Sequence, residues 1–162
     1  EQMYHEMIAT LGGRAAEQII FGHISTGALS DLEKVTKQAT AMVAYYGLDE
    51  KIGNRSYYDS TGQQDYALTK PFSEKTAEII DEQVSKLIES AYQEALRILG
   101  ENIDGLTQLA NKLIDKEVVF GDDLEMIFGK RPWVKEEIDF PKESQQTTDN
   151  GQQSESTEEN LV

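Results

Sequence analysis

The longest regular pattern in this chain is a stripe of apolar residues that recurs every three or four positions between Ser73 and Gly100. This spacing places every member of the stripe on one face of an α-helix. Ser73 is a preferred helix N-cap, and Gly100 is a natural helix end. We therefore expect one helix of about 26 residues, ~39 Å long, with the stripe in the core. The stripe comprises Ala77, Ile80, Val84, Leu87, Ile88, Ala91, Ala95, Ile98 and Leu99.

A second helical pattern, at residues 11–47, is divided by a loop that contains glycine. Gly22 is expected to end the first helix. Ser30 precedes Glu33 by three residues, which is the spacing of a capping box, so we expect the next helix to begin at Ser30. Gly47 should end that helix. Its expected apolar face consists of Leu32, Val35, Ala39, Met42, Val43 and Tyr46.

The other segments predict shorter elements. A helix is expected at residues 102–115 and a last short helix at 121–128, with a short extended segment at 55–58. The inward side of the 102–115 helix is expected to hold Leu106, Leu109, Leu113 and Ile114. The predicted fold class is all-α, a bundle-like arrangement of amphipathic helices with at most one short extended segment.

Composition limits the function classes. At 162 residues with a net charge of −15, the chain suits one domain whose acidic surface disfavours nucleic acid and anionic membrane surfaces. No stretch approaches the roughly 18 apolar residues of a membrane-spanning helix, so this segment is expected to make no direct membrane contact. With no cysteine, thiolate metal sites and disulfides are excluded.

The acidic excess is concentrated at the end of the chain. From residue 136 onward there are eight acidic residues against Lys142 alone, and apolar residues are scarce. Such a composition cannot offset the entropy of ordering. We therefore predict a folded domain at residues 1–133 and an acidic, largely disordered tail at 134–162.

Three residues are candidates for metal binding. His5 and Glu6 begin a motif of the HExxH type, but Ala9 stands where the second histidine is required, so this motif is rejected. His23 lies in the loop and is expected to be solvated. Asp31 is expected in the first turn of a helix, where the helix dipole alone would explain a carboxylate. Position alone therefore leaves the role of Asp31 open between helix stabilisation and metal ligation.

Two further features of the first helix suggest packing. Gly12 and Gly13 inside a helix cost about 1 kcal/mol each relative to alanine, which suggests that another backbone approaches closely. Arg14 and Glu17 stand three residues apart and are expected to form a surface ion pair.

Three long motifs carry a family resemblance: GGRAAEQIIFG, STGALSDLEKVT and MVAYYGLDEKIG. Together with IIDEQVSKLIESAYQEA and LIDKEVVFGDDL further on, they resemble the peptidase domain of FtsH-type ATP-dependent zinc metalloproteases, over roughly residues 11–133. In that family the aspartate of the S/N-D-L-E motif is the third zinc ligand, which the resemblance places at Asp31. The other two ligands belong to an HExxH helix upstream. The chain is thus interpreted as the C-terminal part of a peptidase domain, inactive alone, and the start at Glu1 as the boundary of a piece.

The resemblance also implies properties of the parent protein. Zinc would be shared between Asp31 and the upstream HExxH histidines, whose glutamate would act as general base. ATP and magnesium would belong to a separate ATPase domain. A homo-hexamer would act on unfolded or membrane-protein substrates in protein quality control. It would be anchored at the cytoplasmic face of a bacterial inner membrane, with the mitochondrial inner membrane as the alternative.

A non-enzymatic interpretation remains open. The amphipathic helices would suit an acidic helical oligomerisation or protein-interaction module without catalysis. The sequence upstream of Glu1 distinguishes the two interpretations, because only the protease requires an HExxH helix there.

Overall fold

The computed structural model of the chain describes residues 1–58 and 71–130. In these two ranges the chain forms five α-helices, one short 3-10 helix and one π-helical segment, and no strand. The all-α prediction is confirmed. The extended segment expected at residues 55–58 is not a strand, because the Tyr57 N–H donates to the carbonyl of Ala44, at 2.8 Å, and not to a neighbouring strand.

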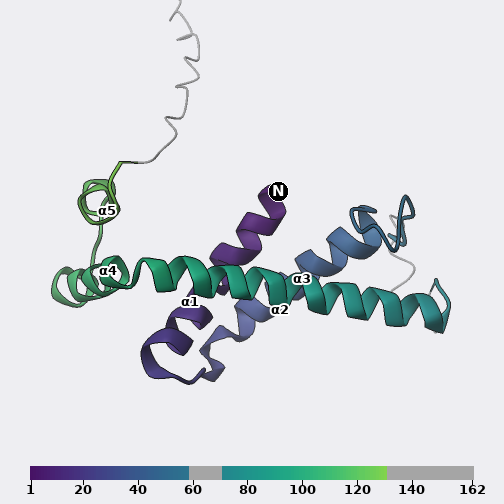
Figure 1. Ribbon diagram of the computed structural model, residues 1–162, viewed down its shortest axis with the longest axis horizontal. Coiled ribbons are helices and arrows are strands. Elements are labelled where there is room, and N and C mark those ends of the chain that lie inside the picture. The colour runs from purple at the N-terminus through teal and green to yellow at the C-terminus, as the bar shows by residue number, and fades with distance from the viewer. Residues whose placement is uncertain (59–70, 131–162) are drawn as a thin grey trace, which may run out of the picture. The chain divides into compact units, whose positions relative to one another are not determined.

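Three helices build the core. Helix α1 (Gln2–Phe21) and helix α3 (Glu74–Glu101) cross each other, and α2 (Leu29–Thr40) contacts both (Figure 1). The Ser73 side chain accepts a hydrogen bond from the Thr76 N–H at 3.3 Å, so the predicted cap of the long helix is confirmed. Helix α3 ends at Glu101, one residue after the end predicted at Gly100.

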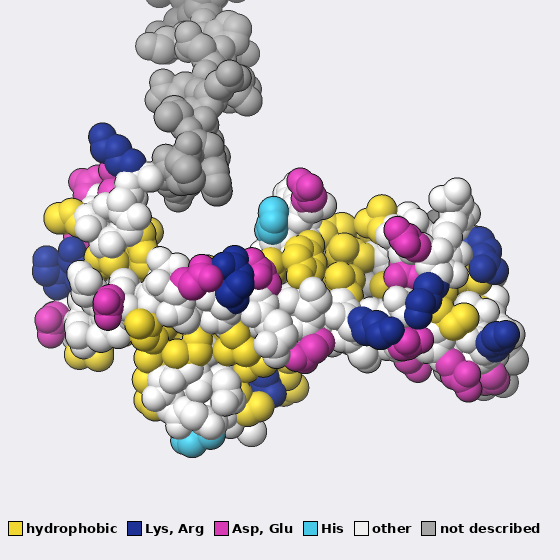
Figure 2. Space-filling model, in the orientation of Figure 1, with side chains coloured by type: hydrophobic (Ala, Val, Ile, Leu, Met, Phe, Trp, Pro, Cys, Tyr) yellow, Lys and Arg dark blue, Asp and Glu magenta, His cyan; other side chains and the backbone are white. Residues whose placement is uncertain are grey.

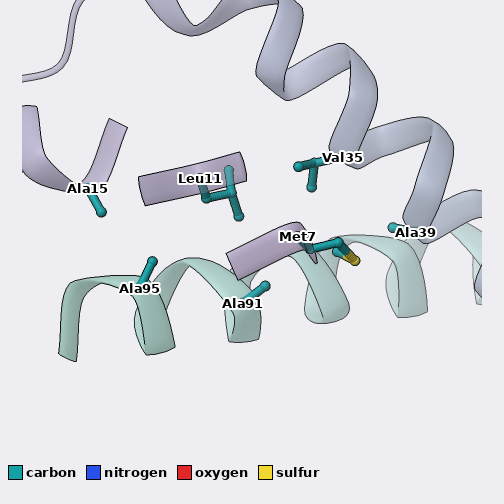
Figure 3. Close-up of a cluster of buried hydrophobic side chains, with 7 residues drawn as sticks. All are labelled: Met7, Leu11, Ala15, Val35, Ala39, Ala91 and Ala95. Atoms are coloured by element: carbon teal, nitrogen blue, oxygen red, sulfur yellow. The ribbon is translucent and has the colours of Figure 1, made fainter. Parts of the chain in front are cut away.

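The first hydrophobic cluster lies where α1 meets its two neighbours. Met7 and Leu11 are fully buried between α3 and α2 (Figure 3). Small residues face them from α3, since Ala91 and Ala95 are also buried. Alanines at these positions let the helix backbones approach closely. The full cluster consists of Met7, Leu11, Ala15, Val35, Ala39, Ala91 and Ala95.

A π-helical segment, η2 (Ala41–Tyr45), continues α2 into a second hydrophobic cluster. The Tyr46 N–H donates to the Ala41 carbonyl five residues back, at 2.9 Å. This wider turn places Ala44 in the core and leaves Tyr46 62% exposed, so the prediction that Tyr46 faces inward is wrong. The second cluster consists of Val43, Ala44, Ile52 and Ile80, and Val84 and Leu87 of α3 pack against both clusters.

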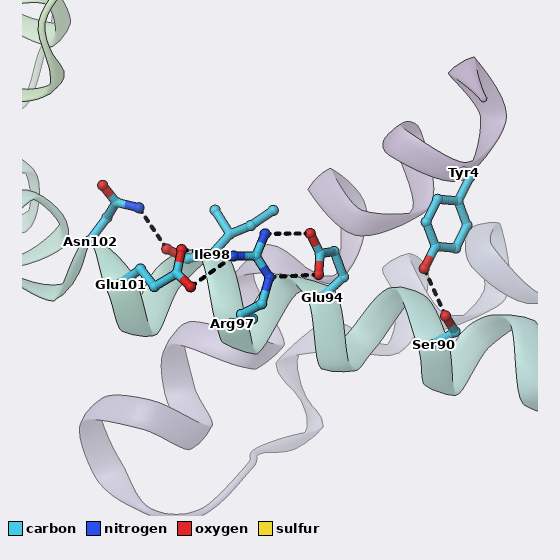
Figure 4. A network of polar contacts seen from close by, with 7 residues as sticks. All are labelled: Tyr4, Ser90, Glu94, Arg97, Ile98, Glu101 and Asn102. Carbon is cyan, nitrogen blue, oxygen red and sulfur yellow. Dashed lines mark hydrogen bonds and ion pairs between the residues drawn. The ribbon is translucent and has the colours of Figure 1, made fainter.

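The outer face of α3 is polar. Arg97 forms ion pairs with Glu94, at 2.6 Å, and with Glu101, at 2.8 Å (Figure 4). Closer to the middle of α3, the Ser90 hydroxyl lies 2.8 Å from the Tyr4 hydroxyl of α1. These polar interactions lie at the solvent-exposed surface of the protein.

Helices α4 (Ile103–Lys116) and α5 (Gly121–Phe128) contribute no fully buried residue. Leu113 and Ile114 are exposed, Ile114 by 77%, so the prediction that they face inward is wrong. The two helices contact each other at Gly105, where a Cβ would collide with the Phe128 ring. Apart from this contact, several apolar side chains of α4 and α5 are exposed, including Ile114 and Met126.

The chain divides into two units, at residues 1–129 and 130–162. The predicted boundary after residue 133 and the predicted acidic tail at 134–162 lie outside the described residues. Among the described helices, none is long and apolar enough to cross a membrane.

Candidate metal centre

The connection from α1 to α2 places the candidate ligand. Helix α1 ends as predicted at Gly22, whose φ of 70° is left-handed and whose N–H donates to the Gln18 carbonyl at 3.1 Å. His23 follows in the loop, exposed, with its ring stacked on that of Phe21 at 6.1 Å. The chain therefore reverses direction immediately after α1.

Glu17 and Ser25 fasten this loop to α1. One carboxylate oxygen of Glu17 accepts the Ser25 hydroxyl proton at 2.7 Å, and the other accepts the Ser25 N–H at 3.1 Å. These two hydrogen bonds lower the pKa of Glu17. No ion pair joins Arg14 and Glu17 in the described chain, so the predicted ion pair is wrong. Arg14 still contributes electrostatically to the lowered pKa of Glu17, after the two bonds from Ser25.

Ser25, and not Ser30, caps the helical segment that follows. The Ser25 hydroxyl accepts the Gly27 N–H at 3.2 Å and begins the 3-10 helix η1 (Thr26–Ala28), which runs directly into α2. Ser30 is already helical, and Glu33 pairs with Lys37 at 2.6 Å. The predicted capping box is therefore wrong. A serine followed two residues later by glycine is a turn pattern that would have favoured Ser25.

Asp31 lies in the first turn of α2, as predicted, and is half-buried. It lines a surface cavity of about 270 Å³ that is bounded by α1 on one side and by η1 and the first turn of α2 on the other. Within the described chain its carboxylate accepts no side-chain or loop hydrogen bond and forms no ion pair. The cavity is lined by Gly13, Arg14, Glu17, Gly27, Ala28 and Asp31.

The cavity fits one ligand of a metal site but not a whole one. Catalytic zinc takes three protein ligands, and in residues 1–58 and 71–130 no three histidine, aspartate or glutamate side chains are arranged to hold a metal ion. His5 and His23 are both exposed. The available carboxylate of Asp31 is compatible with zinc, whereas Glu17 is already engaged by Ser25.

The two glycines of α1 leave open space. A Cβ at Gly12 or Gly13 would meet no other atom of the described chain within 4 Å, so the close backbone approach expected there is absent from these residues. Gly13 lines the Asp31 cavity and also a second, more apolar cavity of about 380 Å³ toward α4.

Apolar side chains surround this second cavity. Ile20 and Phe21 line it and are 49% and 65% exposed. Figure 2 shows hydrophobic side chains at the surface over the C-terminal part of α1 and again on α5. The face of α1 that carries Gly13 therefore remains uncovered within the described chain.

Comparison with known proteins identifies the class and then the family. The chain is 57% identical over 134 residues to the ATP-dependent zinc metalloprotease FtsH of Parabacteroides distasonis, which covers 83% of this chain and 19% of that protein. It is 42% identical over 135 residues to the mitochondrial inner membrane m-AAA protease component AFG3L2 of Mus musculus, covering 83% of this chain and 17% of that protein. These relatives are proteases.

The profile of peptidase family M41 matches residues 1–127, and the chain belongs to this family. The predicted resemblance is thereby confirmed. The chain spans about a fifth of the length of curated relatives that it matches.

Proposed function

We propose that this chain is the C-terminal part of the peptidase domain of a membrane-anchored, ATP-dependent zinc metalloendopeptidase, and that Asp31 supplies one zinc ligand. The observation that carries the proposal is the Asp31 carboxylate, which lines a surface cavity and has no partner among the described residues. A helix start suits a metal ligand, because it is rigid and favours the ionised carboxylate that zinc needs.

The scaffold would hold Asp31 in place. Val35 and Ala39, one and two turns further along α2, are fully buried against α1 and α3, so the helix that carries Asp31 cannot rotate freely. Two histidines of an HExxH segment elsewhere in the protein would complete the ligand set. When bound, zinc would lower the pKa of a coordinated water and polarise a peptide carbonyl.

The open face of α1 supports the same proposal. Among the described residues Gly13 has no neighbour for a Cβ, and it lines the cavity that Asp31 lines, so a further helix could approach α1 closely at this point. With one carboxylate and no second or third ligand in the described residues, the chain alone is predicted to bind zinc weakly and to be inactive.

The remaining properties are proposed from the relatives. Their names describe ATP-dependent zinc metalloproteases and a component of a mitochondrial inner membrane protease. We infer that ATP and magnesium act in a separate domain of the full protein. Unfolded or membrane proteins would be its substrates and a homo-hexamer its assembly. Its location would be the cytoplasmic face of a bacterial inner membrane, or else the mitochondrial inner membrane.

The test is Asp31→Asn in the full-length protein, which keeps the size of the side chain and removes its charge. The variant should lose casein digestion and bound zinc while it retains ATP hydrolysis. Asp104→Asn is the matched control, because Asp104 is also a first-turn aspartate, on α4, and is exposed. Casein digestion by Asp31→Asn at the rate of the control would refute the ligand assignment.

A second candidate is an acidic helical oligomerisation or interaction module without catalysis. The exposed apolar side chains of α4 and α5, which include Ile114, Phe120 and Met126, favour it. Self-association of this chain in sedimentation, together with a full-length protein that binds no zinc, would support the module and exclude the protease.

A further inference from the structure

We propose that the cavity of about 470 Å³ between α1, α2 and α3 binds the C-terminal end of a cleaved peptide, with its new carboxylate on Arg14 and its last, apolar side chain in the cavity. This inference rests on the proposed function, because hydrolysis of a peptide bond is what produces the new carboxylate. The cavity lies beside the one that Asp31 lines, since Arg14 lines both.

The lining of the larger cavity is mostly apolar. It is continuous with the first hydrophobic cluster, because Leu11 belongs to that cluster and Leu32, Ile88 and Leu96 pack against it. Ile24 of the loop also lines the cavity and is 44% exposed. An apolar side chain that entered the cavity would be removed from water together with these residues, which favours its binding.

Arg14 is the group that would select a carboxylate. Among the lysines and arginines of residues 1–58 and 71–130, only Arg14 and Lys112 are half-buried, and the rest are exposed. Lys112 pairs with Asp123, whereas Arg14 forms no ion pair within these ranges. A guanidinium presents a planar fork of N–H donors that matches the two oxygens of a carboxylate. Arg14 is therefore available to an anion that enters the cavity.

Two acidic residues lie near Arg14 without pairing with it. Arg14 helps to lower the pKa of Glu17, after the two bonds from Ser25, but both oxygens of Glu17 accept from Ser25. Glu89 of α3 also lines the cavity and accepts a hydrogen bond from the Gln93 amide at 2.7 Å. The charge of Glu89 would oppose a dianion such as phosphate, so the lining suits a ligand with a single negative charge.

The position of Arg14 links this cavity to the cleavage reaction. A carboxylate formed beside Asp31 would meet the same guanidinium that lines the larger cavity. The end of a cleaved chain offers both an apolar side chain and a carboxylate. An intact chain offers the side chain alone, because its peptide carbonyl carries no charge. The cavity would therefore distinguish cleaved from uncleaved chains.

The experiment measures peptide binding to the full-length protein by fluorescence anisotropy. Zinc is first removed with a chelator, so that the metal cannot bind the carboxylate. The probes are three labelled peptides: one ends in leucine with a free carboxylate, one has the same sequence with a C-terminal amide, and one is an amide with glutamate before the leucine. The free carboxylate should bind about 10-fold more tightly than either amide, which is the size of one hydrogen bond to a charged group.

Variants of the lining separate the two contributions. Arg14→Gln should bind the three peptides equally, and Arg14→Lys, which keeps the charge without the fork, should retain part of the preference. Ile24→Ser should weaken all three by the same factor, because it removes an apolar contact only. Lys34→Gln is the matched control for charge, because Lys34 is exposed on α2 and lies outside the lining of both cavities.

Three results would overturn the inference. Equal affinities for the carboxylate and amide peptides in the native protein would mean that another group of the full-length protein already occupies Arg14. A carboxylate preference that survives in Arg14→Gln would place the anion elsewhere. Equally tight binding of the glutamate peptide would assign an acidic side chain, and not a cleaved end, as the ligand. If Arg14→Gln does not fold, Arg14→Lys and Ile24→Ser decide.

The binding measurement and the test of the proposed function can fail separately, because the first uses metal-free protein. Casein digestion by Asp31→Asn at the rate of its control refutes the zinc-ligand proposal whatever the peptides do. Loss of digestion in Asp31→Asn, with no carboxylate preference in the native protein, refutes only the site for the cleaved end.

Discussion

Lys112 of α4 and Asp123 of α5 form the least exposed ion pair of the described chain, with side chains 20% and 15% exposed. The other carboxylate oxygen of Asp123 accepts the Phe120 N–H at 3.0 Å, at the start of α5. Asp123 therefore joins α5 to α4 and also satisfies a backbone group at the helix start.

Asp123→Ala should lower the thermal unfolding midpoint, because it removes the ion pair and leaves the Phe120 N–H without its acceptor. Asp122→Ala is the control, since Asp122 is exposed in the same first turn and shares only the helix dipole. Circular dichroism melts of the two variants should show the larger decrease for Asp123→Ala. Equal decreases would contradict the structural role of Asp123.

The same pair predicts a pH dependence. The hydrogen bond from Lys112, followed by that from Phe120, lowers the pKa of Asp123 below its usual value of 3.8. The stabilisation from ionised Asp123 is therefore complete above the usual value and is lost as the pH falls through the lowered pKa. The stability advantage of the native chain over Asp123→Asn should be full at pH 7 and should shrink in acid. An advantage that persists unchanged at the lowest pH would contradict the assignment.

Gly13→Ala should separate the stability of this chain from the activity of the whole protein. No atom of the described chain would meet the new Cβ, so the free energy of unfolding should rise by about 0.5–1 kcal/mol. The same methyl group would stand where a further helix is proposed to approach, and peptidase activity of the full-length protein should fall. Gly100→Ala, also unobstructed, is the control that should stabilise without loss of activity. Full activity in Gly13→Ala would count against a helix docked at this position.

Gly47 should tolerate substitution less well than Gly22. Both have positive φ, 63° and 70°, which costs an alanine about 1–2 kcal/mol. At Gly47 a Cβ would also lie 3.0 Å from the Gly53 carbonyl oxygen, whereas a Cβ at Gly22 would meet no atom of the described residues within 4 Å. Chemical denaturation should therefore show a larger loss of stability for Gly47→Ala than for Gly22→Ala. The reverse order would mean that the loop at Gly53 yields more easily than its hydrogen bonds suggest.

Helix ends were predictable where the deciding chemistry is local. Gly22 and Ser73 act on residues within one turn, and both positions are confirmed. The cap of α2 was not predicted, because Ser25 is favoured over Ser30 by a carboxylate eight residues earlier, Glu17, which local patterns do not include. The π-helical segment η2 was not predicted either, because its buried residues Val43 and Ala44 pack against residues distant in the sequence, such as Ile80.

The inward positions of α4 could not be predicted from its apolar pattern, because Leu113 and Ile114 belong to that pattern and yet are 45% and 77% exposed. For Asp31, position alone allowed a helix-dipole interpretation as well as a ligand, and the resemblance favoured the ligand. The structure adds a cavity and a carboxylate that forms no ion pair within residues 1–58 and 71–130. Zinc ligation itself stays a prediction.

The uninterrupted length of α3 has a thermodynamic consequence. Val84 and Leu87 pack against both hydrophobic clusters, so the two clusters share side chains of the same helix. Loss of packing in one cluster should therefore destabilise the other. The α1–α3 body should therefore unfold in a single cooperative transition. Helices α4 and α5, which bury no residue completely, should open first and exchange their amide hydrogens fastest.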